Sequence, residues 1–278
     1  MRVAKNIIIA GKNNIAVDVT RFVLANFPEL TLYVMVNKTD DGVDGFQKSF
    51  LKFSQDNNLR VINLEDCYEL EETLFLSLEY DRLIQPALFK SARLVNIHFS
   101  YLPFYKGMYT SYWPIMNDEK RSGVTLHEID AGIDTGDIIA QKWFDIGDEV
   151  TCRDLYLNYI SHGTSLVEEY VERLLRGDYN THMQPSERSS YFAKSSIDFS
   201  NIKVDLRQTA HGIKKQIRAL TFREYQLAKI EGCPVFGCEI LTSKSNEKTG
   251  TKITETNTYF VFSTIDYDLK IFKENAND

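Results

Sequence analysis

An asparagine and a histidine stand two residues apart where an apolar run ends, in the segment VNIHFSYLPFYKG at residues 95–107. In an extended backbone, Asn96 and His98 point to the same side, because side chains alternate along a strand. The Asn96 amide is a fixed donor that can stabilise an oxyanion as it forms. The His98 imidazole can supply a proton or a positive charge near neutral pH. The spacing alone also fits a capping or structural pair.

A second polar segment, HEIDAGIDTGD at residues 127–137, supplies carboxylates that could serve the same chemistry. A carboxylate beside an imidazole fixes the ring and favours its protonated form by charge attraction. The two segments together indicate a site for proton transfer and oxyanion stabilisation.

The elements that must position these residues follow from the apolar pattern. Short apolar runs predict buried strands at residues 6–10, 31–37, 59–64, 80–84 and 93–98, and helical spacing predicts helices at 15–23 and 44–57. Strands that alternate with helices predict an α/β fold with a doubly wound, mostly parallel sheet. Ligands of such sheets bind outside the carboxyl ends of the strands, where GKNN, RLIQP and NIHFS lie.

The rest of the chain divides the protein into a core at 1–180 and a smaller β-rich module at 190–278. Residues 124–130 and 137–146 read as a strand pair, and Thr151 with Asp154 begins a long helix that ends near Gly177. The polar stretch 181–190 reads as a linker. A helix at 206–220 and several short strands follow, with residues 243–257 expected as turns and the tail ENAND expected to fray.

Composition narrows the class of protein. The 278 residues are 43% hydrophobic and 26% charged, with a net charge of −7, so the general basic surface of a nucleic-acid-binding protein is not expected. No run reaches the length of a membrane span or a signal sequence, so a cytoplasmic protein without membrane contact is expected. The four cysteines lack metal-ligand spacing, so they are expected as free thiols and no metal site is predicted.

The two polar motifs also carry a family resemblance. NIHFSYLPFYKG, followed some 35 residues later by IDAGIDTGDII, resembles the formyltetrahydrofolate-dependent formyltransferases, which include glycinamide ribonucleotide and methionyl-tRNA formyltransferases. The shared pattern is Asn-x-His, a Leu-Pro, an aromatic or basic residue before Gly, and then Asp-x-Gly. The likeness extends in looser form over roughly residues 5–180 and implies a Rossmann-like formyltransferase core.

The resemblance implies a catalytic trio of Asn96, His98 and Asp134, the last because it stands in Asp-x-Gly. The implied cofactor is N10-formyltetrahydrofolate, which leaves as tetrahydrofolate after a primary amine attacks the formyl carbon. Asn96 and protonated His98 would stabilise the oxyanion. Asp134 would hold His98 and help to remove the amine proton.

Two segments are implied as the cofactor site. One is the expected strand end beside Asn96, and the other is the loop before the Asp-x-Gly aspartate. Their residues are Arg82, Leu83, Ile84, Ile129, Asp130, Ala131, Gly132 and Ile133.

The acceptor site is expected at two places in the core. GKNNIAV resembles the first βα loop of the family, and backbone N–H groups at a helix start favour anions, so Lys12, Asn13 and Asn14 are candidate contacts to a phosphorylated acceptor. A polar surface turn is the alternative there. Tyr105, Lys106 and Trp113 lie in the loop after His98 and are expected to line a sugar site.

The segments IRALTFREYQLAKIEG and FSYLPFYKGMYTSYWPI resemble N-formyltransferases that act on dTDP-linked 3-amino or 4-amino dideoxy sugars, on the way to the O-antigens of lipopolysaccharide and similar glycans. Residues 206–229 hold six Lys or Arg and one acid. Lys214 and Arg218 could therefore contact a pyrophosphate, or line a solvated helix face. Phe192, Phe222 and Tyr225 could stack on thymine, or belong to the core.

The expected partners are a dTDP-amino sugar and a reduced folate, with no nucleic acid, in a homodimer. Three alternatives remain at this point. The acceptor could be another phosphorylated amine such as aminoacyl-tRNA, the chain could be a non-catalytic nucleotide-sugar binding or scaffold protein, or the trio could hydrolyse the formyl folate.

Overall fold

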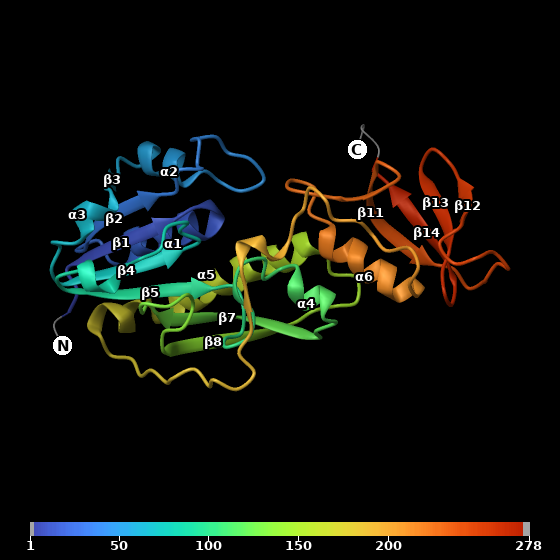
Figure 1. The fold of residues 1–278 in the computed structure, drawn as a ribbon. Helices are drawn as coiled ribbons and strands as arrows, with labels where there is room; N and C mark the ends of the chain where they lie inside the picture. The colour runs from blue at the N-terminus through green and yellow to red at the C-terminus, as the bar shows by residue number, and fades with distance from the viewer. Residues whose placement is uncertain (1–2, 275–278) are drawn as a thin grey trace. The chain divides into compact units, whose positions relative to one another are not determined.

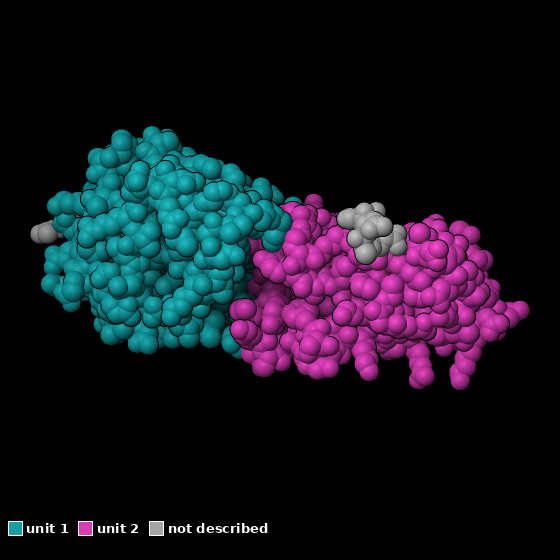
Figure 2. Space-filling model, turned by 90° about the horizontal axis from the view of Figure 1, so that it is seen from above, with its two compact units in different colours: residues 1–107, 122–144, 158–191 teal, residues 108–121, 145–157, 192–278 magenta. Residues whose placement is uncertain are grey.

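The computed structural model describes residues 3–274, and the chain divides into two compact units (Figure 2). Unit 1 consists of residues 1–107, 122–144 and 158–191, and unit 2 of residues 108–121, 145–157 and 192–278. Unlike the division predicted from the sequence, segments 108–121 and 145–157 belong with the C-terminal module. The tail expected to fray lies outside the described residues beyond Glu274.

Unit 1 is built on a seven-stranded sheet with the order β3-β2-β1-β4-β5-β7-β8 (Figure 1). The strands are β1 (Asn6–Gly11), β2 (Thr31–Val36), β3 (Arg60–Val61), β4 (Thr73–Leu78), β5 (Ala92–His98), β7 (Arg121–Glu128) and β8 (Ile138–Asp145). The first five in this order pair in parallel, whereas β5 pairs with β7 antiparallel. The doubly wound, mostly parallel sheet expected from the sequence is therefore confirmed.

Helices cover both faces of this sheet. They are α1 (Asn13–Asn26), α2 (Phe50–Asp56), α3 (Leu64–Cys67), the 3₁₀ turn η1 (Pro86–Leu88) and α5 (Cys152–Arg176). A Cβ at Gly163 of α5 would lie 3.2 Å from Ile15 of α1 and 3.4 Å from Ile97 of β5, so these three elements pack together on one face. Leu64 of α3 packs with Leu94 of β5 on the other face.

Asn96 and His98 share a face with Leu94, because side chains on β5 alternate. The residues of the sequence motif therefore lie on the α3 side of the sheet, where the strand comes to its carboxyl end. This is the edge at which open α/β sheets bind ligands.

The predicted strand at 80–84 is wrong. The strand is β4, and residues 80–84 lie in the connection that follows it. β4 ends because Glu79 takes a left-handed backbone with φ 61°. All six of its residues are buried, which is typical of a parallel strand covered on both faces.

Two other elements are shorter than the sequence predicts. β3 has only two residues, both exposed. The helix expected over 44–57 begins at Phe50, because the Ser49 side chain caps it and Asp40 accepts the backbone N–H groups of Phe50 and Leu51. By contrast, the Thr151–Asp154 start of α5 is confirmed, since the Thr151 hydroxyl accepts the Asp154 N–H and donates to its carboxylate.

Unit 2 carries a five-stranded antiparallel sheet with the order β10-β11-β14-β13-β12. The strands are β10 (Ala228–Ile230), β11 (Cys233–Ile240), β12 (Lys252–Glu255), β13 (Tyr259–Ser263) and β14 (Asp268–Lys273). α6 (Ala210–Leu220) packs against β11 and the short α4 (Trp113–Met116). Three short elements remain: β6 (Lys106–Gly107) in unit 1, β9 (Tyr191–Phe192), and η2 (Lys194–Ser196) in unit 2.

The β-rich C-terminal module is thus confirmed, but the prediction of turns throughout 243–257 is wrong where β12 forms. All four residues of β12 are exposed at the edge of the sheet, so no buried side chain marks it in the sequence. Within residues 3–274, no helix combines the length and the apolar character needed to cross a bilayer.

Candidate active site

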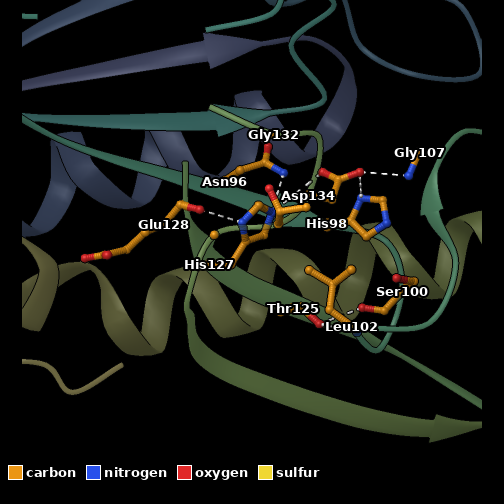
Figure 3. Close-up of polar contacts among 12 residues, drawn as sticks. Asn96, His98, Ser100, Leu102, Gly107, Thr125, His127, Glu128, Gly132 and Asp134 are labelled. Atoms are coloured by element: carbon orange, nitrogen blue, oxygen red, sulfur yellow. Dashed lines mark hydrogen bonds and ion pairs between the residues drawn. The ribbon is translucent and has the colours of Figure 1, made fainter. Parts of the chain in front are cut away.

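The antiparallel pairing of β5 with β7 brings the polar side chains of the candidate site together (Figure 3). In this antiparallel register Asn96 lies opposite His127, and His98 lies opposite Thr125. Directly opposite residues of an antiparallel pair share a face and touch. Each of these two polar residues of β5 therefore lies against a polar residue of β7.

His98 is buried, and its ring is held at one nitrogen by the backbone. Nε2 lies 2.8 Å from the carbonyl oxygen of Tyr105, so Nε2 carries a hydrogen. Nδ1 faces Asp134 Oδ2 at 3.5 Å. Tyr105 presents its carbonyl from a left-handed backbone with φ 58°, and its own N–H donates to the Ser190 hydroxyl at 2.7 Å. Nδ1 is therefore the ring nitrogen that faces the carboxylate.

Asp134 stands in a left-handed conformation with φ 54° and is fixed from both ends. Its Oδ2 accepts the Gly107 N–H at 2.8 Å, and its backbone carbonyl accepts the Gln184 side-chain amide at 2.9 Å. Gln184 also donates to the Gly136 carbonyl, which ties the loop to the segment after α5. The trio predicted from the sequence thus converges in unit 1, while its catalytic role stays a prediction.

A fourth residue, His127, belongs to the cluster although the sequence does not single it out. It is 2% exposed, and its Nε2 lies 3.0 Å from Asn96 Nδ2 and 3.7 Å from Asp134 Oδ1. Burial, as the largest cause, lowers the pKa of His127 to about 4 against the attraction of Asp134, so the ring is neutral near neutral pH. The alternation of residues 124–128 predicts a strand, but only the register of β7 on β5 brings His127 to Asn96, so no local signal in the sequence reveals it.

The two segments implied as the cofactor site lie on the same side of the sheet as the trio. Ile84 and Ile129 both pack against the apolar cluster that includes Leu94. Ile129 is also tied to β5, because its N–H donates to the Leu94 carbonyl at 2.8 Å. Leu83 and Ile133 are 73% and 41% exposed, so each segment offers an apolar side chain to a ligand.

The correction to β4 changes how the first of these segments is placed. Arg82, Leu83 and Ile84 do not end a strand but follow β4 in a loop, in which Arg82 lies 3.6 Å from Glu65. In the second segment, residues 129–133, the Asp130 carboxylate accepts the Gly132 N–H and the Thr135 hydroxyl. This internal bonding shapes the loop that presents Asp134.

At the start of α1, Lys12 is the N-cap residue and supplies no side-chain cap. Asn13 donates to Glu79, and the Asn14 N–H donates to the Gln47 side chain at 3.1 Å. Gln47 is buried, and its Nε2 has no partner among the described residues. The backbone N–H of Asn14, one of the donors expected to bind a phosphate, is therefore already bonded to Gln47, a residue that the sequence analysis does not select.

The other expected acceptor contacts are divided between the two units. Tyr105 and Lys106 are buried in unit 1, and Trp113 stacks on Phe192 in unit 2 with ring centroids 4.2 Å apart. Tyr225 is exposed and packs on the buried Phe222, whose 3% exposure favours the core interpretation.

Lys214 and Arg218, expected at a pyrophosphate, have partners within unit 2. Lys214 pairs with Glu149, and Arg218 donates to the carbonyls of Gly147 and Val150 at 2.9 and 2.8 Å. A structural role in holding the 147–150 segment explains these contacts. Among the described residues, no group of His, Cys, Asp and Glu is arranged to hold a metal ion.

Comparison with known proteins adds three findings. The family model described as formyl transferase matches residues 11–169. The N-formyltransferase of Helicobacter canadensis, solved in complex with folinic acid and dTDP-3-aminofucose, is 42% identical and superposes with a TM-score of 0.87, over 98% of this chain and 100% of that chain. WlaRD, a sugar 3N-formyl transferase solved with dTDP and 5-N-formyl-THF, is 41% identical with a TM-score of 0.86, over 99% of each chain.

Curated relatives match more weakly and in part. The methionyl-tRNA formyltransferase of Clostridium beijerinckii is 31% identical over 164 residues, which is 57% of this chain and 51% of that protein. The match thus spans about half the length of this curated relative. Because the family model covers more than half of the chain, and two solved formyltransferases match it along nearly its whole length, the chain belongs to the formyl transferase family.

Proposed function

We propose that this protein transfers a formyl group from N10-formyltetrahydrofolate to the amine of a dTDP-linked amino sugar, with a 3-amino dideoxy sugar as the first candidate and a 4-amino sugar as the second. The observation that carries the proposal is the convergence of Asn96, His98 and Asp134 at the carboxyl end of β5. An amide donor, an imidazole and a carboxylate are the groups that acyl transfer to an amine requires.

In this proposal each side chain has a task that its geometry supports. The cofactor supplies the formyl carbon as the electrophile. The Asn96 amide has a second Nδ2 hydrogen beyond the one directed at His127, and this hydrogen can bond to the formyl oxygen as negative charge builds on it. Asp134 Oδ2 already accepts the Gly107 N–H, which leaves Oδ1 as the oxygen better able to take a proton from the attacking amine. His98 Nδ1 lies beside the carboxylate and could pass that proton to the folate nitrogen, which would leave as tetrahydrofolate when its bond to the formyl carbon breaks.

The residues present also fit a reduced folate. Leu83 and Ile133 are exposed apolar side chains of the two segments that pack, through Ile84 and Ile129, on the Leu94 side of the sheet. A planar ring can pack against such side chains. The solved relatives that match nearly the whole chain carry folinic acid in one case and 5-N-formyl-THF in the other. These likenesses support a formylated folate as the donor.

The identity of the acceptor is supported by the same two relatives, one solved with dTDP-3-aminofucose and the other described as a sugar 3N-formyl transferase. A 4-N formyltransferase from Francisella tularensis is only 20% identical to the chain. The net charge of −7 argues against a tRNA acceptor, since a tRNA requires many phosphate contacts. As the resemblance of the sequence implies, the formylated sugar would serve the assembly of O-antigens and related glycans.

The test is a set of parallel reactions with N10-formyltetrahydrofolate and one acceptor each: a dTDP-3-amino sugar, a dTDP-4-amino sugar, methionyl-tRNA and buffer alone. Products are read by mass spectrometry, with the Asn96→Ala protein as the matched blank. We expect a formylated dTDP-3-amino sugar with wild type, and formation of it about 100-fold or more slower, but measurable, with the variant. If methionyl-tRNA is formylated faster than the amino sugars, the tRNA acceptor replaces this proposal. If the formyl folate is deformylated at the same rate with and without an amine acceptor, hydrolysis of the folate replaces it.

A further inference from the structure

We propose that His127 is a positioning residue that fixes which end of the Asn96 amide faces the reacting formyl group. The inference rests on the proposed formyl transfer and deepens it. His127 itself contacts neither the folate nor the amine in this scheme. It acts through Asn96, its direct cross-strand partner in the β5–β7 pair (Figure 3).

The argument begins at the other nitrogen of the His127 ring. Nδ1 lies 2.7 Å from the carbonyl oxygen of Glu128, and a carbonyl oxygen can only accept. Nδ1 must therefore carry the hydrogen. Because the buried ring is neutral near neutral pH, Nε2 carries none and is an acceptor.

The state of Nε2 determines the state of Asn96. An acceptor at 3.0 Å requires a donor opposite it, so the amide nitrogen of Asn96, and not its oxygen, must face His127. An Asn side chain is otherwise free to exchange these two ends by turning about its last bond. The relay from the Glu128 carbonyl through His127 removes this freedom, so the second Nδ2 hydrogen always points away from His127.

This matters because the two ends of the amide have opposite effects on a forming oxyanion. A hydrogen of Nδ2 stabilises the developing charge, whereas Oδ1 in the same place repels it. Burial adds to the effect, because the ring that holds the amide is only 2% exposed and water has little room to replace it. Displacing a catalytic group by about 1 Å can lower the reaction rate by about 100-fold.

Two amide substitutions separate the two ring nitrogens. In His127→Gln the side chain is long enough to place an acceptor near the position of Nε2. In His127→Asn the shorter side chain keeps a donor near the position of Nδ1 and loses the acceptor. We expect His127→Asn to lower kcat by about tenfold to 100-fold with little change in KM for either substrate, and His127→Gln to recover most of that loss.

The decisive control is the Asn96→Ala background. A residue that acts only through Asn96 has nothing left to position there, so His127→Asn should cause little further loss when added to Asn96→Ala. Thermal unfolding of all four variants shows whether the fold persists. Equal losses from Gln and Asn, or an undiminished effect of His127→Asn in the Asn96→Ala background, would overturn the proposal.

A second measurement does not depend on activity. In ¹⁵N-histidine-labelled wild-type protein at pH 7, we expect the His127 resonances to show a protonated Nδ1 and a bare Nε2, with the assignment made by the signals lost in His127→Gln. A hydrogen found on Nε2 would require Asn96 Oδ1 to face the ring and would reject the inference. If no amine acceptor is formylated but this tautomer is found, the proposed function fails while the positioning of Asn96 stands.

Discussion

The carbonyl oxygen of Tyr105 lies 2.8 Å from Nε2 of His98 and so selects the ring nitrogen that is available for chemistry. Because Nε2 donates its hydrogen to this backbone carbonyl, Nδ1 is the nitrogen beside Asp134. The carbonyl is presented by a residue with φ 58°, which a non-glycine residue adopts only when its surroundings hold it there. The loop after β5 therefore sets, through the orientation of one peptide group, which ring nitrogen of His98 faces Asp134.

His98→Ala should lower kcat for formyl transfer by about 100-fold or more, because it removes the group that exchanges a proton beside Asp134. The measurement is the steady-state rate with a saturating dTDP-amino sugar and formyl folate. Phe99→Leu, a substitution in the neighbouring residue on the opposite face of the sheet, serves as the control for local packing. A His98→Ala enzyme that turns over within a few-fold of wild type would remove His98 from the mechanism.

Gly136→Ala should destabilise the Asp134 loop severely. An added Cβ at this position would lie 1.8 Å from the Glu128 carbonyl oxygen, so the backbone of β7 or of the loop must shift. The matched control is Gly45→Ala, where the added atom meets nothing within 4 Å. We expect Tm to fall by several degrees for Gly136→Ala, consistent with about 1–3 kcal/mol for overpacking, and to change little for Gly45→Ala. Equal Tm values for the two variants would contradict the close approach.

The neutral state of buried His127 makes stability depend on pH. Its pKa is lowered from 6.5 to about 4 in the folded chain, chiefly by burial, so below pH 6.5 the unfolded chain binds a proton that the folded chain does not. The contribution is fully present above pH 6.5 and is lost as pH falls from 6.5 towards 4, by roughly 3 kcal/mol in total.

Urea unfolding at pH 7.5, 6, 5 and 4.5 measures this loss. The His127→Gln protein lacks the titrating group and is the control for the other ionisable residues. Its free energy of unfolding should fall less steeply over the same range. Parallel curves for the two proteins would show that His127 does not carry a lowered pKa.

Arg218 and Lys214 offer a test between a structural and a substrate-binding role. Arg218 donates to two backbone carbonyls and is half-buried, so Arg218→Ala should cost about 1–3 kcal/mol of stability by leaving those acceptors without a partner. Lys214 pairs with the exposed Glu149, so Lys214→Met should change stability by less than about 1 kcal/mol.

Unfolding curves and Michaelis constants for both variants decide the matter. If the basic segment instead binds the pyrophosphate, KM for the sugar nucleotide rises in both variants while the free energy of unfolding stays near that of wild type. A stable Arg218→Ala protein with a raised KM would therefore favour the interpretation first suggested by the charge of this segment.

The residues of the trio could be picked out from the sequence because two short motifs carry the family resemblance, and their catalytic role stays a prediction. Asn96 and His98 stand two residues apart in one strand and so share a face, and Asp134 stands in a short turn motif. His127 could not be found in this way, because its importance depends on the antiparallel register that sets it opposite Asn96. The composition of residues 124–128 predicts a strand but does not say which strand it pairs with.

The strand predicted at 80–84 is misplaced because the sequence does not show where β4 ends. Residues 73–84 are apolar at both ends, and the interruption that ends β4 is the left-handed backbone of Glu79, a residue type that rarely takes this conformation. The basic face of α6 was ambiguous because charge is visible in a sequence but the partner of a charge is not. Glu149 and the carbonyls of the 147–150 segment reach Lys214 and Arg218 only in the folded unit.

The antiparallel pairing of β7 with β5 places a constraint on how members of this family can change in length. An insertion in the connection between the two strands leaves the pairing intact. Inside β7 before His127, one residue gained would instead turn Leu126 towards Asn96, and one residue lost would turn Glu128 towards it. Either change sends the imidazole to the opposite face, because the pleat repeats every two residues. Insertions and deletions in related chains should therefore gather before Arg121 and after Glu128, and spare the eight residues between these limits.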